Sequence, residues 1–284
     1  MHFSCRMQIV LQIMSKMRSS RNLRIGIIGF GSMGSAIAKA LKGTSITGNI
    51  LCCDPNKEKR QKAAQLGFGA TGSVEDIAQK CNWIFLCVKP YDLQNILVLL
   101  KPLISSQVLL SIAAGKRIRH IEKWVGKKKI VRVMPNIAAL ASQSVNVYSC
   151  KNVSAQERRY AAKLLSSFGS AMELPEKYFD AVTAVSGSGP AFVAYFIESL
   201  AHAGVRNGLP QGVAYRIALE TAAGTVALLK EKGLQPKIVR DRVTSKGGTT
   251  AAGRKVLEDG MFQNILINTI TAAKRRSGEI GRNG

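Results

Sequence analysis

Three glycines early in the chain have the spacing of a phosphate-binding turn. Gly29, Gly31 and Gly34 form Gly-x-Gly-x-x-Gly between a β-rich run and a segment of helical period. In that setting the first glycine makes a tight turn, the second admits a pyrophosphate, and the third lets the helix pack close to the strand. Free N–H groups at the start of the helix then face the phosphates. We therefore expect Gly29, Gly31, Ser32, Met33 and Gly34 to bind a dinucleotide, with a plain glycine-rich turn as the weaker alternative.

A carboxylate follows at the position expected for a ribose contact. Asp54 ends the next expected strand, twenty residues after Gly34. A carboxylate there accepts hydrogen bonds from the ribose of NAD and repels the 2′-phosphate of NADP. Lys57, Lys59 and Arg60 come directly afterwards, and cations can pair with that phosphate. The sequence therefore predicts NADP or NAD without choosing between them, and a solvated helix face explains the three cations equally well.

A second segment, residues 245–250 (Ser-Lys-Gly-Gly-Thr-Thr), has the composition of a small carboxylate site. We expect Ser245 to cap a helix, while Gly247 and Gly248 leave backbone N–H groups uncovered at its start. Such a nest binds a carboxylate. The hydroxyls of Thr249 and Thr250 can donate to a substrate oxygen or nitrogen. An ordinary capped helix explains one serine and one glycine, but not the whole segment.

The elements that must position these residues change in kind once along the chain. Up to about Leu174, β-rich runs alternate with helical segments, which indicates βαβ units and a parallel sheet with helices on both faces. The expected strands are Arg24–Ile28, Asn49–Cys53, Trp83–Val88, Gln107–Ile112, Ile130–Met134 and Val145–Tyr148. The expected helices are Met33–Lys42, Lys57–Leu66, Asp92–Leu100 and Ala155–Phe168.

After Pro175 the pattern is helical throughout. The expected helices are Ala191–Asn207, Gly212–Lys232, Pro236–Val243, Thr249–Glu258 and Phe262–Ser277. The predicted fold class is α/β, with an N-terminal Rossmann doubly wound sheet followed by an all-α C-terminal domain. The predicted divisions are an N-terminal extension (1–22), a dinucleotide-binding domain (23–174) and a helical domain (175–284).

Composition limits the classes of protein that remain. The formal net charge is +24 over 284 residues, but the basic residues are spread along the chain and no nucleic-acid-binding motif accompanies them. We therefore expect a basic surface suited to anionic small molecules, with no specific nucleic acid as partner. The six cysteines form no Cys-x-x-Cys pair, which indicates a reducing compartment, taken as the cytoplasm, and no structural metal.

The first 22 residues contain no acidic residue, as in some transit peptides. Their apolar stretch, Ile9–Met14, is too short to span a bilayer, and no other run reaches the roughly 18 apolar residues needed. We therefore expect an extension outside the fold and no membrane partner.

Several motifs taken together resemble pyrroline-5-carboxylate reductases. The resemblance covers about Leu23 to Gly278, and the Ser-x-Gly-Gly-Thr-Thr segment is its most specific part. The motifs are Cys87-Val-Lys89-Pro90, Ser111-Ile-Ala-Ala-Gly115, Val131-Arg-Val-Met134-Pro135-Asn136, Val185-Ser-Gly-Ser-Gly-Pro-Ala191, Ala203-Gly-Val-Arg-Asn-Gly-Leu209-Pro210 and Val243-Thr-Ser245-Lys-Gly247-Gly248-Thr249-Thr250.

This resemblance implies an NAD(P)-dependent reduction of the C=N bond of 1-pyrroline-5-carboxylate, the last step of proline synthesis. It implies that the 245–250 loop and Asn136 bind this imino acid, and that the Thr250 hydroxyl faces the imine nitrogen. It assigns a further group of residues to the cofactor, and it implies intertwined dimers, often assembled further, built on the helical domain. The added cofactor residues are Val88, Lys89, Pro90, Ala113 and Ala114.

Two departures leave other functions open. The family usually carries Pro where Lys246 stands, and Thr-Pro where Ile137 and Ala138 stand. A related reductase acting on another cyclic imine or a small keto or hydroxy acid is therefore a second hypothesis. A third is a non-catalytic dinucleotide-binding protein whose basic surface holds nucleic acid, which a steeply salt-dependent affinity without turnover would indicate.

Overall fold

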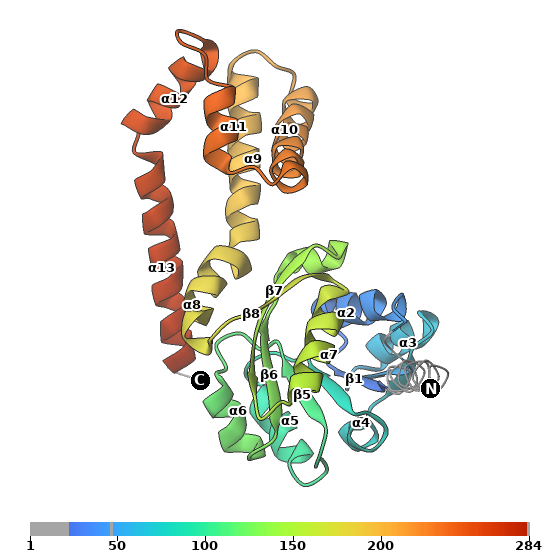
Figure 1. The fold of residues 1–284 in the computed structure, drawn as a ribbon. Helices are drawn as coiled ribbons and strands as arrows, with labels where there is room; N and C mark the ends of the chain where they lie inside the picture. Colours follow the sequence, from blue (N-terminus) through green and yellow to red (C-terminus); the bar gives the residue numbers. More distant parts are fainter. Residues whose placement is uncertain (1–22, 46–47, 283–284) are drawn as a thin grey trace, which may run out of the picture. The chain divides into compact units, whose positions relative to one another are not determined.

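The computed structural model describes residues 23–45 and 48–282 (Figure 1). The predicted extension, residues 1–22, and Cys5 within it lie outside the described residues. Contacts divide the described chain into two compact units. Ser188–Ala273 form the second unit, and the described residues before and after them form the first. The predicted division near residues 174 and 175 rests on the type of element and stays a prediction.

The first unit is built on one eight-stranded sheet in the order β3-β2-β1-β4-β5-β6-β7-β8. The first six strands are parallel, β7 is antiparallel to β6, and β8 is parallel to β7. The strands are β1 (Ile25–Ile28), β2 (Ile50–Cys53), β3 (Gly69–Thr71), β4 (Trp83–Leu86), β5 (Val108–Ser111), β6 (Lys129–Met134), β7 (Ser144–Lys151) and β8 (Gly169–Glu173). All six predicted strands are present. The two that were not predicted, β3 and β8, are short or have no apolar alternation that a sequence pattern could reveal.

Helices cover both faces of this sheet, as the βαβ pattern predicted. Alternate strand residues enter opposite cores, because successive side chains point to opposite faces. Ile27 and Phe85 belong to one core and Ile28 and Leu86 to the other. The first core is covered by α2 (Ser32–Lys42), α3 (Lys57–Gln65) and α7 (Ala155–Ser166), and the second by α4 (Val74–Lys80), α5 (Leu93–Leu100) and α6 (Ile118–Val125). The short helices α4 and α6 were not predicted.

Between β8 and the second unit the chain forms three short helical pieces. They are the 3-10 helix η2 (Glu176–Tyr178), α8 (Phe179–Val182) and the π-helix η3 (Thr183–Gly187). Phe179 is buried in the first unit at 1% exposure. This segment connects the sheet to the helices that follow and carries the Val185–Gly187 part of the quoted motif.

The second unit is helical, as predicted. Its helices are α9 (Gly189–Arg206), α10 (Gln211–Lys232), α11 (Pro236–Arg242), α12 (Thr249–Asp259) and the first half of α13 (Phe262–Arg282). The helices α9 and α10 pair as a hairpin in which a Cβ on Gly204 would lie 3.2 Å from the Cβ of Ala214. Throughout Ser188–Ala273 only three residues are buried, Ala201, Ala214 and Ala218. Large apolar side chains such as Val193 (57%) and Tyr195 (70%) are exposed instead.

One described helix, α10, is long and apolar enough by length and composition to cross a membrane, with 11% of its apolar window buried. No unbroken apolar run of this length was expected from the sequence, and the apolar stretch of α10 includes Arg216 and Glu220. Length and composition alone do not assign this helix to a bilayer.

Candidate functional site

The predicted cofactor residues converge on one edge of the sheet. The strands β1, β2, β4, β5 and β6 are parallel, so their carboxyl ends share this edge, where open α/β sheets bind ligands. The strand order reverses between β1 and β4, and open α/β sheets bind their ligands at such a switch point. A Cβ on Gly29, after β1, would lie 2.6 Å from the carbonyl oxygen of Cys87, after β4. The predicted turns therefore meet at this switch point.

The three glycines of the first motif differ in what constrains them. Gly29 has φ +96°, a backbone conformation that suits glycine. A Cβ on Gly34 would lie 2.0 Å from the carbonyl oxygen of Gly29, so helix α2 packs directly against the turn. Gly31, the N-cap residue of α2, has no heavy atom within 4 Å of its would-be Cβ. The space beside Gly31 is open, as a pyrophosphate approach requires.

The amino end of α2 suits an anion. No side chain caps this end, and its first turn contains no acidic residue. Ser32 is exposed and Met33 is half-buried at the start of the helix. Uncapped N–H groups and the helix dipole both favour a negatively charged ligand there.

Asp54 is placed at the expected edge, but its carboxylate already has partners. It is 4% exposed. Its Oδ2 accepts from the backbone N–H of Phe30 at 2.8 Å, and its Oδ1 accepts from the N–H of Asn56 at 3.0 Å. The ammonium of Lys59 lies 3.4 Å from Oδ2, and the Arg60 guanidinium donates to the carbonyl oxygens of Asp54 and Pro55. In this structure Asp54 joins the end of β2 to the glycine-rich turn.

The remaining predicted cofactor residues lie in the turns after β4 and β5. Val88 and Pro90 are half-buried and Lys89 is exposed. Ala113 is 5% exposed, whereas Ala114 is exposed in the turn that leads to α6. That turn has weak internal support: the N–H of Ala113 lies 3.4 Å from the Ser111 hydroxyl, and the N–H of Lys116 lies 3.4 Å from the Ala113 carbonyl.

Two acidic residues that sequence reasoning missed support the start of α6. Glu176 Oε1 accepts from the backbone N–H of Ile118 at 2.8 Å and from the Arg132 guanidinium at 2.7 Å. Arg132 is 5% exposed and stacks 4.5 Å from the ring centre of Phe179. Burial lowers the pKa of this guanidinium, and its hydrogen bond to Glu176 opposes the shift. The second acid is Asp180, whose carboxylate lies 3.3 Å from Arg117. Their separation of more than forty residues from these partners hides the pairs from any local pattern.

Asn136 follows β6, but its amide is engaged in structural contacts. The oxygen accepts from the N–H of Ala138 at 3.2 Å, and the nitrogen donates to both the carbonyl and the hydroxyl of Ser186 at 3.3 Å. Ser144 adds a hydroxyl that accepts from the backbone N–H of Asn136 at 3.0 Å. Asn136 thus links the turn after β6 to the π-helix η3 and the motif that contains it.

The 245–250 segment forms a turn that leads into α12. The N–H of Gly248 donates to the carbonyl of Ser245 at 3.1 Å, and Gly247 has φ +71°. This places Lys246 and Gly247 at the central positions of a type II turn. The expected N-cap was wrong: α12 is capped by Gly248 without a side-chain hydrogen bond, because the turn places Ser245 three residues earlier.

The start of α12 is nevertheless open to an anion. A Cβ on Gly248 would lie 2.3 Å from the Ser245 hydroxyl oxygen, so a side chain there would require that hydroxyl to rotate away. Thr249 and Thr250 are the first two residues of α12, and both are exposed. Their backbone N–H groups belong to the unpaired first turn of a helix. Of the predicted nest, the N–H of Gly248 is engaged with the Ser245 carbonyl, whereas those of Thr249 and Thr250 stand in the first turn of α12. This segment lies in the second unit, whereas Asn136 and the cofactor residues lie in the first.

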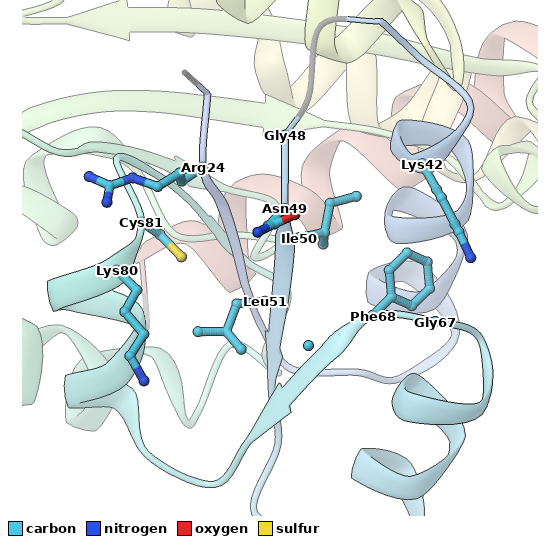
Figure 2. A pocket seen from close by; sticks show the side chains of 11 residues that line it. Arg24, Lys42, Gly48, Asn49, Ile50, Leu51, Gly67, Phe68, Lys80 and Cys81 are labelled. Atoms are coloured by element: carbon cyan, nitrogen blue, oxygen red, sulfur yellow. The ribbon is translucent and has the colours of Figure 1, made fainter. Parts of the chain in front are cut away.

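A cavity of about 550 Å³ lies at the opposite edge of the sheet, before the amino ends of the outer strands (Figure 2). Three cations line it, but in Figure 2 the charged ends of Arg24, Lys42 and Lys80 point away from one another. Two already have partners: the Lys42 amine donates to the carbonyl of Leu66 at 2.6 Å, and that of Lys80 to Asp76 at 2.6 Å. This cavity therefore offers no convergent anion site.

The described cysteines are free thiols that behave as core or partly buried residues. Burial raises the pKa of Cys52 to about 12 and that of Cys81 to about 11. Such thiols stay protonated and unreactive near neutral pH. Among the described residues no group of three His, Cys, Asp or Glu side chains could hold a metal.

Comparison with known proteins finds a family model for each of two parts of the chain. Residues 176–280 match the family model for pyrroline-5-carboxylate reductase dimerisation, and residues 24–115 match that for coenzyme F420-dependent NADP oxidoreductases. The pyrroline-5-carboxylate reductase of Aquifex aeolicus is 40% identical over 260 residues, covering 91% of this chain and 97% of that protein. The chain belongs to the pyrroline-5-carboxylate reductase family.

Other members of the family agree over similar lengths. The Pisum sativum reductase is 34% identical, covering 92% of this chain and 97% of its own. Among solved structures, the Plasmodium falciparum pyrroline carboxylate reductase with NADP bound is 34% identical with a TM-score of 0.82, covering 92% of this chain and 99% of that one. Prephenate dehydrogenase from A. aeolicus, at 16% identity and a TM-score of 0.53, shares the fold alone.

Membership of the family confirms the predicted fold class, the oxidoreductase chemistry on a C=N bond and the use of NAD(P). The match of residues 176–280 to a dimerisation model supports a homo-oligomer. The roles of the individual site residues remain predictions.

Proposed function

We propose that this protein reduces 1-pyrroline-5-carboxylate to L-proline with NADPH or NADH. The observation that carries this proposal is the likeness, over nearly the full length of each chain, to reductases of that name at 32–40% identity. The geometry adds two suitable anion sites, the uncapped amino ends of α2 and α12. A dinucleotide and a small carboxylate are the two anions that the reaction needs.

The residues at the sheet edge fit a dinucleotide. The open space at Gly31 and the uncapped start of α2 suit the pyrophosphate, and the turns after β4 and β5 lie at the same edge of the sheet. We assign the cofactor to these turns, with Val88, Lys89, Pro90, Ala113 and Ala114 as contacts. When bound, NAD(P)H supplies the hydride that reaches the imine carbon.

The substrate carboxylate is assigned to the backbone N–H groups of Thr249 and Thr250, in the first turn of α12. Reduction adds a hydride to the imine carbon and leaves a proton on the nitrogen, which converts C=N to an amine. We place the Thr250 hydroxyl at this nitrogen, where it orients the imine and holds the proton. Positioning of an already electrophilic protonated imine accounts for most of the catalysis, so no activated nucleophile is required. For Asn136 we propose a supporting role in substrate binding, in which its amide holds Ser186 of the motif that leads into α9.

The test of this mechanism is a pair of substitutions at Thr250. Thr250→Val keeps the branched shape and removes the hydroxyl, and Thr250→Ser keeps the hydroxyl. We expect kcat to fall about 10- to 100-fold in the valine variant, the usual cost of one transition-state hydrogen bond, and to stay within about threefold of wild type in the serine variant. The measurement is loss of NAD(P)H absorbance with pyrroline-5-carboxylate. Equal rates for both folded variants would remove the hydroxyl from the mechanism.

A substrate panel distinguishes the proposed reaction from its alternatives. Wild-type protein is assayed with pyrroline-5-carboxylate, another cyclic imine and small keto acids, with NADPH and NADH in parallel. Fast turnover of a keto acid but not of the imine would favour the related reductase. Dinucleotide binding without turnover, together with a salt-dependent affinity for nucleic acid, would favour the binding protein.

We also propose that the helical unit forms a homodimer. Its exposed apolar side chains and the apolar length of α10 suit burial against a second copy. For location we propose the cytoplasm. The free thiols at the five described cysteines are consistent with a reducing compartment.

A further inference from the structure

The last turns of α13 pack against the turn that leads from β5 to α6, within the first unit. A Cβ on Gly281 would lie 3.4 Å from the carbonyl oxygen of Gly115 and 3.5 Å from the Nε of Arg117. Ile280 approaches from the same side: its Cγ2 lies 2.7 Å from the would-be Cβ of Gly115, which has φ +75°. The chain thus returns, more than 160 residues later, to cover the Ala113–Lys116 turn.

Asp180 joins these two segments. Its Oδ1 accepts from the hydroxyl of Ser277 at 2.9 Å, and its Oδ2 accepts from the Arg117 guanidinium at 3.3 Å. Its side chain is 28% exposed and that of Arg117 is 32% exposed, so both are partly shielded from water. Hydrogen bonds to charged groups are stronger than neutral ones, and partial burial limits their screening. The carboxylate of Asp180 therefore links the end of α13 to Arg117, the N-cap residue of α6.

A second acid, Glu176, supports the residues that follow the Ala113–Lys116 turn. Glu176 holds the N–H of Ile118 while it pairs with the buried Arg132. The Ala113–Lys116 turn contributes little support of its own, because its two internal hydrogen bonds are both 3.4 Å long. Its conformation therefore depends on the contacts at its end, which come from Glu176, from Asp180 and from α13.

We propose that Asp180 is a positioning residue for the cofactor, and that the C-terminal turn of α13 (Ser277–Arg282) is its partner in this role. By holding Ser277 and Arg117 together, Asp180 fixes the turn in which Ala113 and Ala114 would contact the cofactor. The inference rests on the proposed function only for the assignment of these two alanines to the dinucleotide. An acid and a helix end that do not contact the reacting atoms thereby set the affinity for NAD(P)H.

The test measures cofactor binding separately from catalysis. The variants are Asp180→Ala, the conservative Asp180→Glu, and Ser277→Ala, which removes one donor and leaves the carboxylate. Glu173→Gln is the matched control, because it removes an acid of the first unit from an exposed ion pair with Arg158. The readouts are the Kd for NADPH by fluorescence titration without substrate, the KM for NADPH, kcat at saturating NADPH, and Tm.

We expect Asp180→Ala to raise the Kd and KM for NADPH about tenfold, the factor that loss of one charge-assisted hydrogen bond produces. Ser277→Ala raises them about threefold, Asp180→Glu recovers part of the affinity, and Glu173→Gln changes nothing. At saturating NADPH, kcat stays within about twofold of wild type, because the reacting groups are untouched. A residue with a merely structural role would lower Tm without this division between KM and kcat.

Several outcomes would overturn the inference. An unchanged Kd in folded Asp180→Ala is one, and a loss of kcat with unchanged KM is another. If Asp180→Ala does not fold, an unchanged Kd in Ser277→Ala decides against it. Wild-type protein that binds NADPH but does not reduce pyrroline-5-carboxylate would defeat the proposed function and leave this test intact. Wild-type protein that binds neither nicotinamide would defeat both.

Discussion

The carboxylate of Asp54 accepts hydrogen bonds from the N–H groups of Phe30 and Asn56, one on each oxygen. Phe30 lies inside the glycine-rich turn, between Gly29 and Gly31. Because the carboxylate is 4% exposed, its main measurable role is to hold this turn in place. We therefore expect the preference between NADP and NAD to depend more on the exposed residues of α3 than on Asp54.

We therefore predict that Asp54→Asn weakens NADPH and NADH alike. An asparagine offers one acceptor where two N–H groups need one each, so the turn loses a hydrogen bond of about 1 kcal/mol or more. The Kd values of both cofactors should rise about five- to tenfold, with their ratio within about threefold of wild type. Fluorescence titration of both cofactors checks this. A large shift of the ratio toward NADPH would show that the carboxylate acts on the ribose instead.

Gly31 shows the opposite case, a glycine that the protein itself does not require. Its φ of −79° is open to any residue, and no heavy atom lies within 4 Å of its would-be Cβ. Gly31→Val should therefore keep the Tm close to wild type and abolish binding of both cofactors, because the side chain fills the space proposed for the pyrophosphate. Gly34→Ala is the contrast, and it should lower Tm, since its Cβ would collide with Gly29. Retained NADPH affinity in folded Gly31→Val would refute the assignment of this turn.

At the scale of elements, the turn before α12 accounts for one of the departures from the family pattern. Lys246 stands at the first central position of a turn whose second central position, Gly247, has φ +71°. Proline suits the first position of a type II turn, because its ring presets φ near −65°. The usual proline of the family is thus explained by the backbone, and lysine leaves the turn less restricted in the unfolded chain.

We predict that Lys246→Pro raises the free energy of unfolding by about 0.4–1 kcal/mol. The gain comes from lower entropy of the unfolded chain. Gly247→Ala should lower the same quantity by about 1 kcal/mol, since its side chain is strained at positive φ. Urea unfolding of the full chain at one fixed protein concentration measures both. Destabilisation by Lys246→Pro would show that residues 245–248 do not form the proposed turn.

On the scale of the whole molecule, the helical unit has too little interior for its apolar residues. In Ser188–Ala273 the buried residues are three alanines, whereas valine, leucine, isoleucine and tyrosine side chains stay exposed on α9, α10 and α13. Burial of such surface against a second copy contributes roughly 25 cal/mol per Å² of apolar area. The net charge of +24 opposes association through repulsion, and salt weakens that repulsion.

We predict that Val193→Glu shifts the protein toward a monomer. Val193 is 57% exposed on α9, and a carboxylate there would be buried without a partner in the dimer. Val98→Glu is the matched control, since Val98 is 52% exposed on α5 of the first unit. Sedimentation velocity over a dilution series, with activity measured in parallel, checks both variants. A wild-type chain that sediments as a fully active monomer would contradict the proposed dimer.

Local regularities of the sequence were enough to predict much of this protein. The strand before Gly29, the helix after Gly34 and the switch from alternating to helical periods after Pro175 are short-range patterns, and the structure has all of them. The parallel order of the strands then brings their carboxyl ends to one edge, so the shared edge of the predicted cofactor turns followed from the element order alone. The family likeness was carried by short motifs of the same kind.

Tertiary structure decided which oxygen, nitrogen or hydroxyl is already engaged. The sequence suggested ribose for Asp54, substrate for Asn136 and a helix cap for Ser245, and the fold assigns backbone contacts to the first two and a turn to the third. Glu176 and Asp180 had no visible role until folding brought them to Arg132 and Arg117. A sequence records which groups are available for hydrogen bonding. Only the folded chain determines which of them meet, because their partners come from elements far apart along it.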